Sequence, residues 1–224
     1  QHATRKRPIA GGKPEPGIYR RAGELVGAQN PLAVGDRLET DIMGAVAAGV
    51  PAMHVLTGVH MARDVIRAPR GQRPSYLAID MRGLLEAHPA PKHHRDGTWT
   101  CGLSQVAKAH RSGVLTLDEV ELTEPVTITI DSYRALAAAA WEYADATGAA
   151  PSCPEITVVS NDDPAGIVTA PEPTVAPADD DDFFDVAANA DSLPEPGAEM
   201  PAFLPGEEEL EQLLEATADL DDEA

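Results

Sequence analysis

A short acidic loop that follows a run of apolar residues constrains the fold of this chain more than any other feature. The run at residues 31–34, Pro-Leu-Ala-Val, is typical of a strand buried in a parallel sheet, and Gly35 allows a sharp change of direction after it. Asp36 therefore falls at the carboxyl end of the predicted strand. Open α/β sheets bind their ligands at this edge, so Asp36 is expected to face a ligand site.

A helix and a second strand are predicted directly after the loop. Thr40 and Asp41 are residue types that cap helices, and the helix is expected to begin there and to end at Gly49. The apolar residues at 52–56 predict a second buried strand. A strand, an acidic loop, a helix and a strand in this order predict an α/β fold containing part of a doubly wound, Rossmann-like parallel sheet.

The two aspartates of the loop, Asp36 and Asp41, predict a site for a hard cation. Their positions at a strand end and in the first turn of a helix allow both carboxylates to converge above the sheet. Oxygen ligands suit Mg²⁺, which keeps several waters and is commonly held by one or two carboxylates together with a phosphate. The structural alternative is that Asp36 only ends a strand and Asp41 only caps a helix. The isolated histidines His54 and His60 are expected to be structural rather than metal ligands.

Two segments, GGKPEPGIYRRAGEL and GDRLETDIMGAVAAGVPAMHVLTGV, resemble the haloacid dehalogenase-like (HAD) phosphatases, in particular the 4-nitrophenylphosphatase and phosphoglycolate phosphatase branch. The resemblance begins near residue 12, ends near residue 85, and covers well under half of the chain. It implies Mg²⁺-dependent hydrolysis of a phosphate monoester, with a small phosphorylated metabolite as substrate. It also implies that Lys13 binds phosphate, that Asp36 is a Mg²⁺ ligand, and that Asp41 is a supporting acid of the metal site.

The nucleophile that this resemblance implies is missing from the sequence. In the family an apolar strand is followed by a DxDG motif, whose aspartate attacks phosphorus, and no such motif occurs in the 224 residues. The DGT at 96–98 is a poor substitute, because two histidines and an arginine precede it in place of an apolar strand. We therefore expect the chain to be the C-terminal part of a phosphatase and to be inactive by itself.

Two helices outside the acidic loop follow from periodicity and capping. The helix predicted between Pro16 and Gly27 is expected to bury one face, because its apolar residues recur at helical spacing. These residues are Ile18, Tyr19, Ala22, Leu25 and Val26. Beyond the phosphatase-like residues 1–88, residues 89–150 are expected to form a small α+β unit that contains a helix capped by Asp131 or Ser132.

The last part of the chain, residues 151–224, has a different composition. It holds 21 of the 37 acidic residues and none of the 17 lysines and arginines. Few aromatic residues and many prolines leave too little apolar surface to offset chain entropy, so a disordered acidic tail is predicted. The leucines of 207–220 fall near one helical face and could fold on a protein partner. The alternative function is accordingly a non-catalytic interaction protein that works through its acidic tail.

The overall charge and hydropathy argue against several classes of partner. The net charge of −20 disfavours nonspecific binding to nucleic acid or to an anionic membrane. No apolar run approaches the roughly 18 residues of a membrane span, and the basic N-terminus lacks the apolar segment of a signal peptide. The two cysteines, Cys101 and Cys153, lie far apart and are expected to be free thiols of a cytoplasmic protein.

Overall fold

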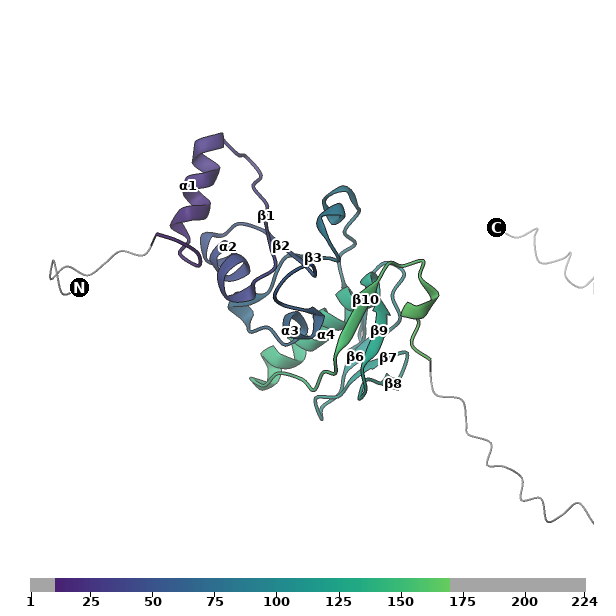
Figure 1. Ribbon diagram of the computed structural model, residues 1–224. Coiled ribbons are helices and arrows are strands. Elements are labelled where there is room, and N and C mark those ends of the chain that lie inside the picture. The colour runs from purple at the N-terminus through teal and green to yellow at the C-terminus, as the bar shows by residue number, and fades with distance from the viewer. Residues whose placement is uncertain (1–10, 170–224) are drawn as a thin grey trace, which may run out of the picture. The chain divides into compact units, whose positions relative to one another are not determined.

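Three parallel strands form the first sheet of the computed structural model, which describes residues 11–169 (Figure 1). In spatial order they are β1 (Ala33–Gly35), β2 (Ala52–Val55) and β3 (Tyr76–Ala78). All four residues of the central strand β2 are buried, as expected for a parallel sheet that is covered on both faces. Val34 pairs with Met53, which in turn pairs with Tyr76. The predicted part of a parallel α/β sheet is confirmed.

Helical crossovers join these strands, as parallel pairing requires. Between β1 and β2 a π-helical turn, Leu38–Ile42, continues into α2, Met43–Ala48. Between β2 and β3 the chain forms α3, Ala62–Ile66, and a 3₁₀ turn, Arg70–Gln72. After β3 a second 3₁₀ turn, Met81–Leu85, is capped by the Asp80 carboxylate.

The helix after the acidic loop begins earlier than predicted. Its N-cap is Arg37, so the prediction of a cap at Thr40 or Asp41 is wrong. The Asp41 carboxylate instead reaches back and accepts a hydrogen bond from the Arg37 N–H at 3.2 Å. A π-helical turn is rare in proteins and occurs frequently at functional sites.

The first helix, α1 (Gly17–Val26), forms where predicted but does not bury the predicted face. None of its residues is buried, and Leu25 and Val26 are 68% and 79% exposed. The prediction of a core face is therefore wrong, although Tyr19 is partly buried against the core. Periodicity indicates an apolar face without indicating what covers it, and in the described part of the chain α1 packs chiefly on α2. Gly27 ends the helix with φ 60°, as predicted.

The chain after β3 forms a five-stranded antiparallel sheet and a parallel strand pair, the second strand of which lies beyond the predicted unit 89–150. The antiparallel strands follow chain order. They are β4 (Lys92–His93), β5 (Trp99–Thr100), β6 (Ala107–Ala109), β7 (Leu115–Leu117) and β8 (Val120–Glu121). The long helix α4, Ile130–Thr147, joins the parallel strands β9, Val126–Thr129, and β10, Ile156–Val159.

Two boundaries in this part differ from the sequence predictions. The side chain of Thr129, rather than Asp131 or Ser132, caps α4. The chain after Pro151 is also folded, since β10 pairs with β9 and a 3₁₀ turn follows at Pro164–Gly166. The acidic tail therefore does not begin at residue 151. The predicted helix at 207–220 lies outside the described residues.

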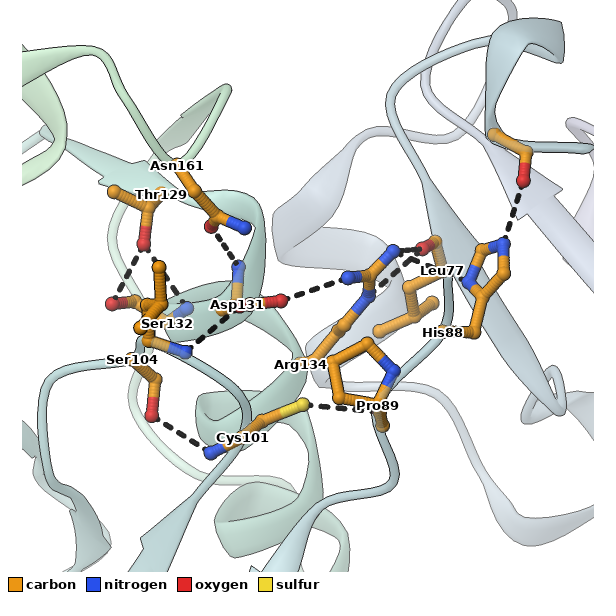
Figure 2. Close-up of polar contacts among 12 residues, drawn as sticks. Leu77, His88, Pro89, Cys101, Ser104, Thr129, Asp131, Ser132, Arg134 and Asn161 are labelled. Atoms are coloured by element: carbon orange, nitrogen blue, oxygen red, sulfur yellow. Dashed lines mark hydrogen bonds and ion pairs between the residues drawn. The ribbon is translucent and has the colours of Figure 1, made fainter. Parts of the chain in front are cut away.

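A buried ion pair joins α4 to β3 (Figure 2). The side chains of Arg134 and Asp131 are 6% and 4% exposed, and the guanidinium donates to the carboxylate at 2.8 Å. It also donates to the Leu77 carbonyl at 3.0 and 3.2 Å and lies 3.2 Å from His88 Nδ1. The Leu103 N–H donates to the other oxygen of Asp131 at 3.0 Å. The charges are thus paired and hydrogen-bonded, as burial requires.

The apolar core is continuous across these elements. One cluster of buried residues includes Ile42 after the acidic loop, Ile66 in α3, Leu117 in β7 and Leu136 in α4. All the described residues also fall within one compact unit of the chain, Gln1–Glu172. None of the helices in residues 11–169 has the length and apolar character that a membrane crossing requires.

Candidate functional site

Lys13 and Asp41 form an ion pair near the carboxyl end of β1. The Lys13 ammonium donates to Asp41 Oδ1 at 2.5 Å, while the Arg37 N–H donates to Oδ2. The hydrogen bond to Asp41 and the charge of that carboxylate raise the pKa of Lys13 above its ordinary value of 10.5. The Asp41 side chain is 11% exposed and that of Lys13 is 51% exposed. A largely buried carboxylate therefore orients a lysine whose ammonium remains accessible to an anion.

Close packing around Asp41 depends on two glycines and a tyrosine. A Cβ on Gly35 would overlap the Asp41 side chain, and a Cβ on Gly44 would lie 2.6 Å from the Tyr19 ring. Tyr19 Oη donates to the Asp41 carbonyl at 2.8 Å. Burial, followed by the negative charge of Asp41, raises the pKa of Tyr19. Sequence reasoning missed this contact, because Tyr19 counts equally well as one more apolar residue of a helical face.

Asp36 directly follows β1, as predicted, and is half-buried. Its Oδ2 accepts a hydrogen bond from the Val59 N–H at 2.7 Å. A Cβ on Gly58 would overlap this oxygen, so the loop after β2 approaches Asp36 closely. Among the described residues no donor contacts the other oxygen, Oδ1. After the hydrogen bond and charge of Asp41, the charge of Asp36 makes a smaller contribution to the raised pKa of Lys13, so Asp36 lies within electrostatic reach of the Lys13 ammonium.

The two histidines near the sheet both contact the acidic loop. His54 is fully buried in β2, and its Nε2 lies 3.2 Å from the Asp36 carbonyl. Burial lowers the pKa of His54, which keeps the ring neutral. His60 Nδ1 accepts a hydrogen bond from the Leu38 N–H at 3.1 Å, and its Nε2 lies 3.3 Å from a Glu39 oxygen. Both rings thus contact the loop in ways that strand or helix patterns do not reveal.

The donor set at this site fits a cation that keeps much of its water. In residues 11–169 no group of three or more His, Cys, Asp or Glu side chains is arranged to hold a metal ion. The available carboxylates are Asp36 and Asp41, and one or two carboxylates suffice for Mg²⁺ when phosphate and water complete its shell. Both Asp41 oxygens already accept hydrogen bonds, whereas Asp36 Oδ1 does not. The arrangement favours Asp36 as the direct ligand and Asp41 as the support for Lys13.

Known proteins similar to this chain are phosphatases. Residues 10–84 match a family model described as HAD-hydrolase-like. The D-glycerol 3-phosphate phosphatase of Mycobacterium tuberculosis is 45% identical over 82 residues, which are 37% of this chain and 23% of that protein. This chain therefore spans about a quarter of the length of that relative.

Two solved structures are also similar. The crystal structure of glycerol phosphate phosphatase from M. tuberculosis in complex with magnesium is 30% identical, with a TM-score of 0.45, over 69% of this chain and 42% of that one. The crystal structure of 4-nitrophenylphosphatase from Thermotoga maritima is 32% identical, with a TM-score of 0.34, over 37% of this chain and 32% of that one.

Proposed function

We propose that residues 10–84, which match the HAD-hydrolase-like family model, hold phosphate and Mg²⁺ in a phosphate-monoester hydrolase. The observation that carries the proposal is the Lys13–Asp41 ion pair, which lies within electrostatic reach of Asp36. The accessible Lys13 ammonium offers a group to a phosphate, and Asp36 Oδ1, unpaired in the described part of the chain, offers one to a cation. Phosphatase relatives support the same assignment.

The residues of this site act by electrostatics. Lys13 binds phosphoryl oxygens and offsets the negative charge that develops on them, and Asp41 holds the ammonium in place before the substrate arrives. Asp36 would hold Mg²⁺ through Oδ1, and the bound ion would supply Lewis-acid stabilisation of the phosphoryl oxygens. Because the Asp41 and Asp36 carboxylates are already fixed by hydrogen bonds from the backbone, little reorganisation of the site is needed when phosphate and Mg²⁺ bind.

The covalent step of the proposed hydrolysis requires a nucleophile. No DxDG motif occurs in the sequence, so we propose that a segment outside it supplies the nucleophile and that this chain alone does not turn over substrate. The substrate class that we propose is a small phosphorylated metabolite, as the name of the M. tuberculosis relative, a D-glycerol 3-phosphate phosphatase, suggests. Steady turnover of 4-nitrophenyl phosphate by the chain alone would contradict this part of the proposal.

Calorimetric titration of the full chain with Mg²⁺ tests the proposed metal site. The wild-type chain should bind one ion, and Asp36→Asn should weaken binding by about tenfold or more, because the substitution removes the anionic ligand. Asp80→Asn is the matched control: Asp80 closely follows β3, as Asp36 follows β1, but its carboxylate is paired with Arg82. Equal affinities for the wild-type chain and Asp36→Asn would remove Asp36 from the site.

The remaining assignments stay predictions. The non-catalytic alternative, and the protein partner expected for the segment 207–220, concern residues outside the described range. The cytoplasmic location also stays a prediction, with which the two free, buried cysteines accord.

A further inference from the structure

The backbone of the acidic loop is held by the rings of two histidines, His54 at Asp36 and His60 at Leu38, whose presence neither phosphate binding nor cation binding explains. The Asp36 carbonyl accepts a hydrogen bond from His54 Nε2 at 3.2 Å and another from the His60 N–H at 3.1 Å. His54 comes from β2 and His60 from the loop after it. The neighbouring Val59 N–H binds the carboxylate of the same aspartate. Side chain and backbone of Asp36 are therefore fixed from one segment.

The buried environment of His54 shows that packing alone does not account for it. Its ring is fully buried, and within the described part of the chain its Nδ1 has no hydrogen-bond partner. A buried polar atom without a partner lowers stability, whereas a leucine would fill a similar volume without that cost. The polar contact that the ring does make is with the Asp36 carbonyl. This contact is the feature that a leucine could not reproduce.

His60 fixes the next turn of the same loop. Leu38 is the first residue of the π-helical turn, and its N–H is one of the donors that a helix start leaves without a partner. His60 Nδ1 accepts from this N–H, while its Nε2 faces the Glu39 carboxylate. In both histidines Nε2 therefore carries the proton, since it faces an oxygen acceptor in each case.

We propose that His54 and His60 are positioning residues, which hold the Asp36–Leu38 backbone so that Asp36 Oδ1 stays directed toward a bound cation. The His54 ring acts through the carbonyl of Asp36, and the His60 ring acts through the N–H of Leu38, while the His60 main-chain N–H, which every variant keeps, also binds the Asp36 carbonyl. The hold on the backbone is independent of any ligand. The effect on cation binding rests on the proposed function.

Amide hydrogen exchange of the metal-free full chain, followed by NMR, tests the hold on the backbone. In His54→Leu and His60→Leu, exchange at Leu38 and Val59 should become faster by about tenfold, the equivalent of one lost hydrogen bond. In His54→Gln the amide NH₂ replaces the Nε2–H donor, and in His60→Asn the amide oxygen replaces Nδ1, so both should restore slow exchange. His94→Leu, which removes a contact with Thr100 in the other sheet, is the control.

The melting temperature separates positioning from a purely structural role. His54→Leu should melt no lower than the wild-type chain, because it removes the unpaired Nδ1 while it loosens the loop. Unchanged exchange at Leu38 and Val59 in both leucine variants would overturn the proposal. Faster exchange throughout the chain, with a lower melting temperature, would also overturn it, because the histidines would then support the fold in general.

Mg²⁺ titration of the same variants tests the consequence for the cation. The affinity for Mg²⁺ should fall by about fivefold in His54→Leu and recover in His54→Gln, because the backbone of the Asp36 ligand is no longer held in the leucine variant. If the leucine variants bind Mg²⁺ as the wild-type chain does, positioning for the cation is wrong. If the wild-type chain binds no Mg²⁺ at all, the proposed function fails, and the exchange data alone decide whether the histidines hold the loop.

Discussion

Asp41 has three hydrogen-bond partners in the candidate site. Its carboxylate accepts from Lys13 and from the Arg37 N–H, and its carbonyl accepts from Tyr19. Asp41→Ala should therefore cost about 1–3 kcal/mol of unfolding free energy, because it leaves a backbone donor without its acceptor. Lys13→Met should cost at most about 1 kcal/mol, since the ammonium is half exposed. Urea unfolding measures both, and a larger cost for Lys13→Met would contradict this order.

The Lys13–Asp41 ion pair should also give the chain a defined pH dependence. The pKa of Lys13 is raised in the folded state, so the ion pair contributes fully below the unfolded value of about 10.5 and is lost as pH rises through the folded value. The difference in unfolding free energy between the wild-type chain and Lys13→Met should shrink as the pH rises above about 10.5. A difference that grows over this range would contradict the raised pKa.

Gly58 should tolerate no side chain, because its Cβ would occupy the place of Asp36 Oδ2. Gly58→Ala should cost about 1–3 kcal/mol, as overpacking does, and should weaken Mg²⁺ binding. Gly23→Ala is the control, since nothing lies near its Cβ and alanine favours the exposed helix α1 by about 0.5–1 kcal/mol. Equal unfolding free energies for the two variants would show that the loop after β2 does not pack closely against Asp36.

Sequence reasoning predicted the three charged residues of the candidate site but not the groups that contact them. The positions of Asp36 and Asp41 after a predicted strand point to the acidic loop, and the family resemblance adds Lys13 from the segment before α1. Tyr19 and His60 contact the loop through tertiary hydrogen bonds at separations of 22 residues. Such contacts depend on how the elements pack, which local periodicity does not encode.

At the scale of elements, α1 shows where periodicity leads to a wrong conclusion. Its apolar residues have helical spacing, but its face is exposed in the described part of the chain. Leu25→Ala should therefore change the unfolding free energy by less than about 0.5 kcal/mol. Leu136→Ala in α4, where the side chain is fully buried, should cost about 2–5 kcal/mol. A comparable cost at both positions in chemical unfolding would show that α1 is covered in solution.

The contact between α4 and β3 depends on the buried pair of Arg134 and Asp131. Arg134→Leu should cost about 3–5 kcal/mol, because it leaves a buried carboxylate without its cation and the Leu77 carbonyl without its donors. The double variant Arg134→Leu/Asp131→Asn should cost less than Arg134→Leu alone, since no charge is left unpaired. Thermal unfolding compares them, and an additive loss in the double variant would contradict a coupled pair.

Strand β10 shows a different reason why a prediction from the sequence failed. β10 lies in the acidic, proline-rich stretch that composition assigns to a disordered tail, yet it pairs with β9 across the length of α4. Its four residues, Ile-Thr-Val-Val, carry a local strand signal that the surrounding composition obscures. These residues are stabilised as a strand by pairing with β9, and the composition of the segment does not indicate this distant partner.

For the whole molecule, the two cysteines report on global unfolding. Cys101 and Cys153 are buried, and burial raises the pKa of each thiol to about 11. At about pH 8 the native thiols should react with iodoacetamide at least 100-fold more slowly than in denaturant, because little thiolate is present and access is blocked. Mass spectrometry of the alkylated chain measures the two rates. Rapid labelling of either cysteine in the native chain would contradict its burial.

Titration of the full chain with orthophosphate, with and without Mg²⁺, tests the central claim most directly. We predict that Mg²⁺ strengthens phosphate binding by about tenfold or more, and that Lys13→Met and Asp36→Asn each abolish the gain. Lys92→Met, at an exposed lysine of β4, should bind phosphate as the wild-type chain does. Phosphate binding that is independent of Mg²⁺, or equal in Lys13→Met and the wild-type chain, would contradict the assignment of this site.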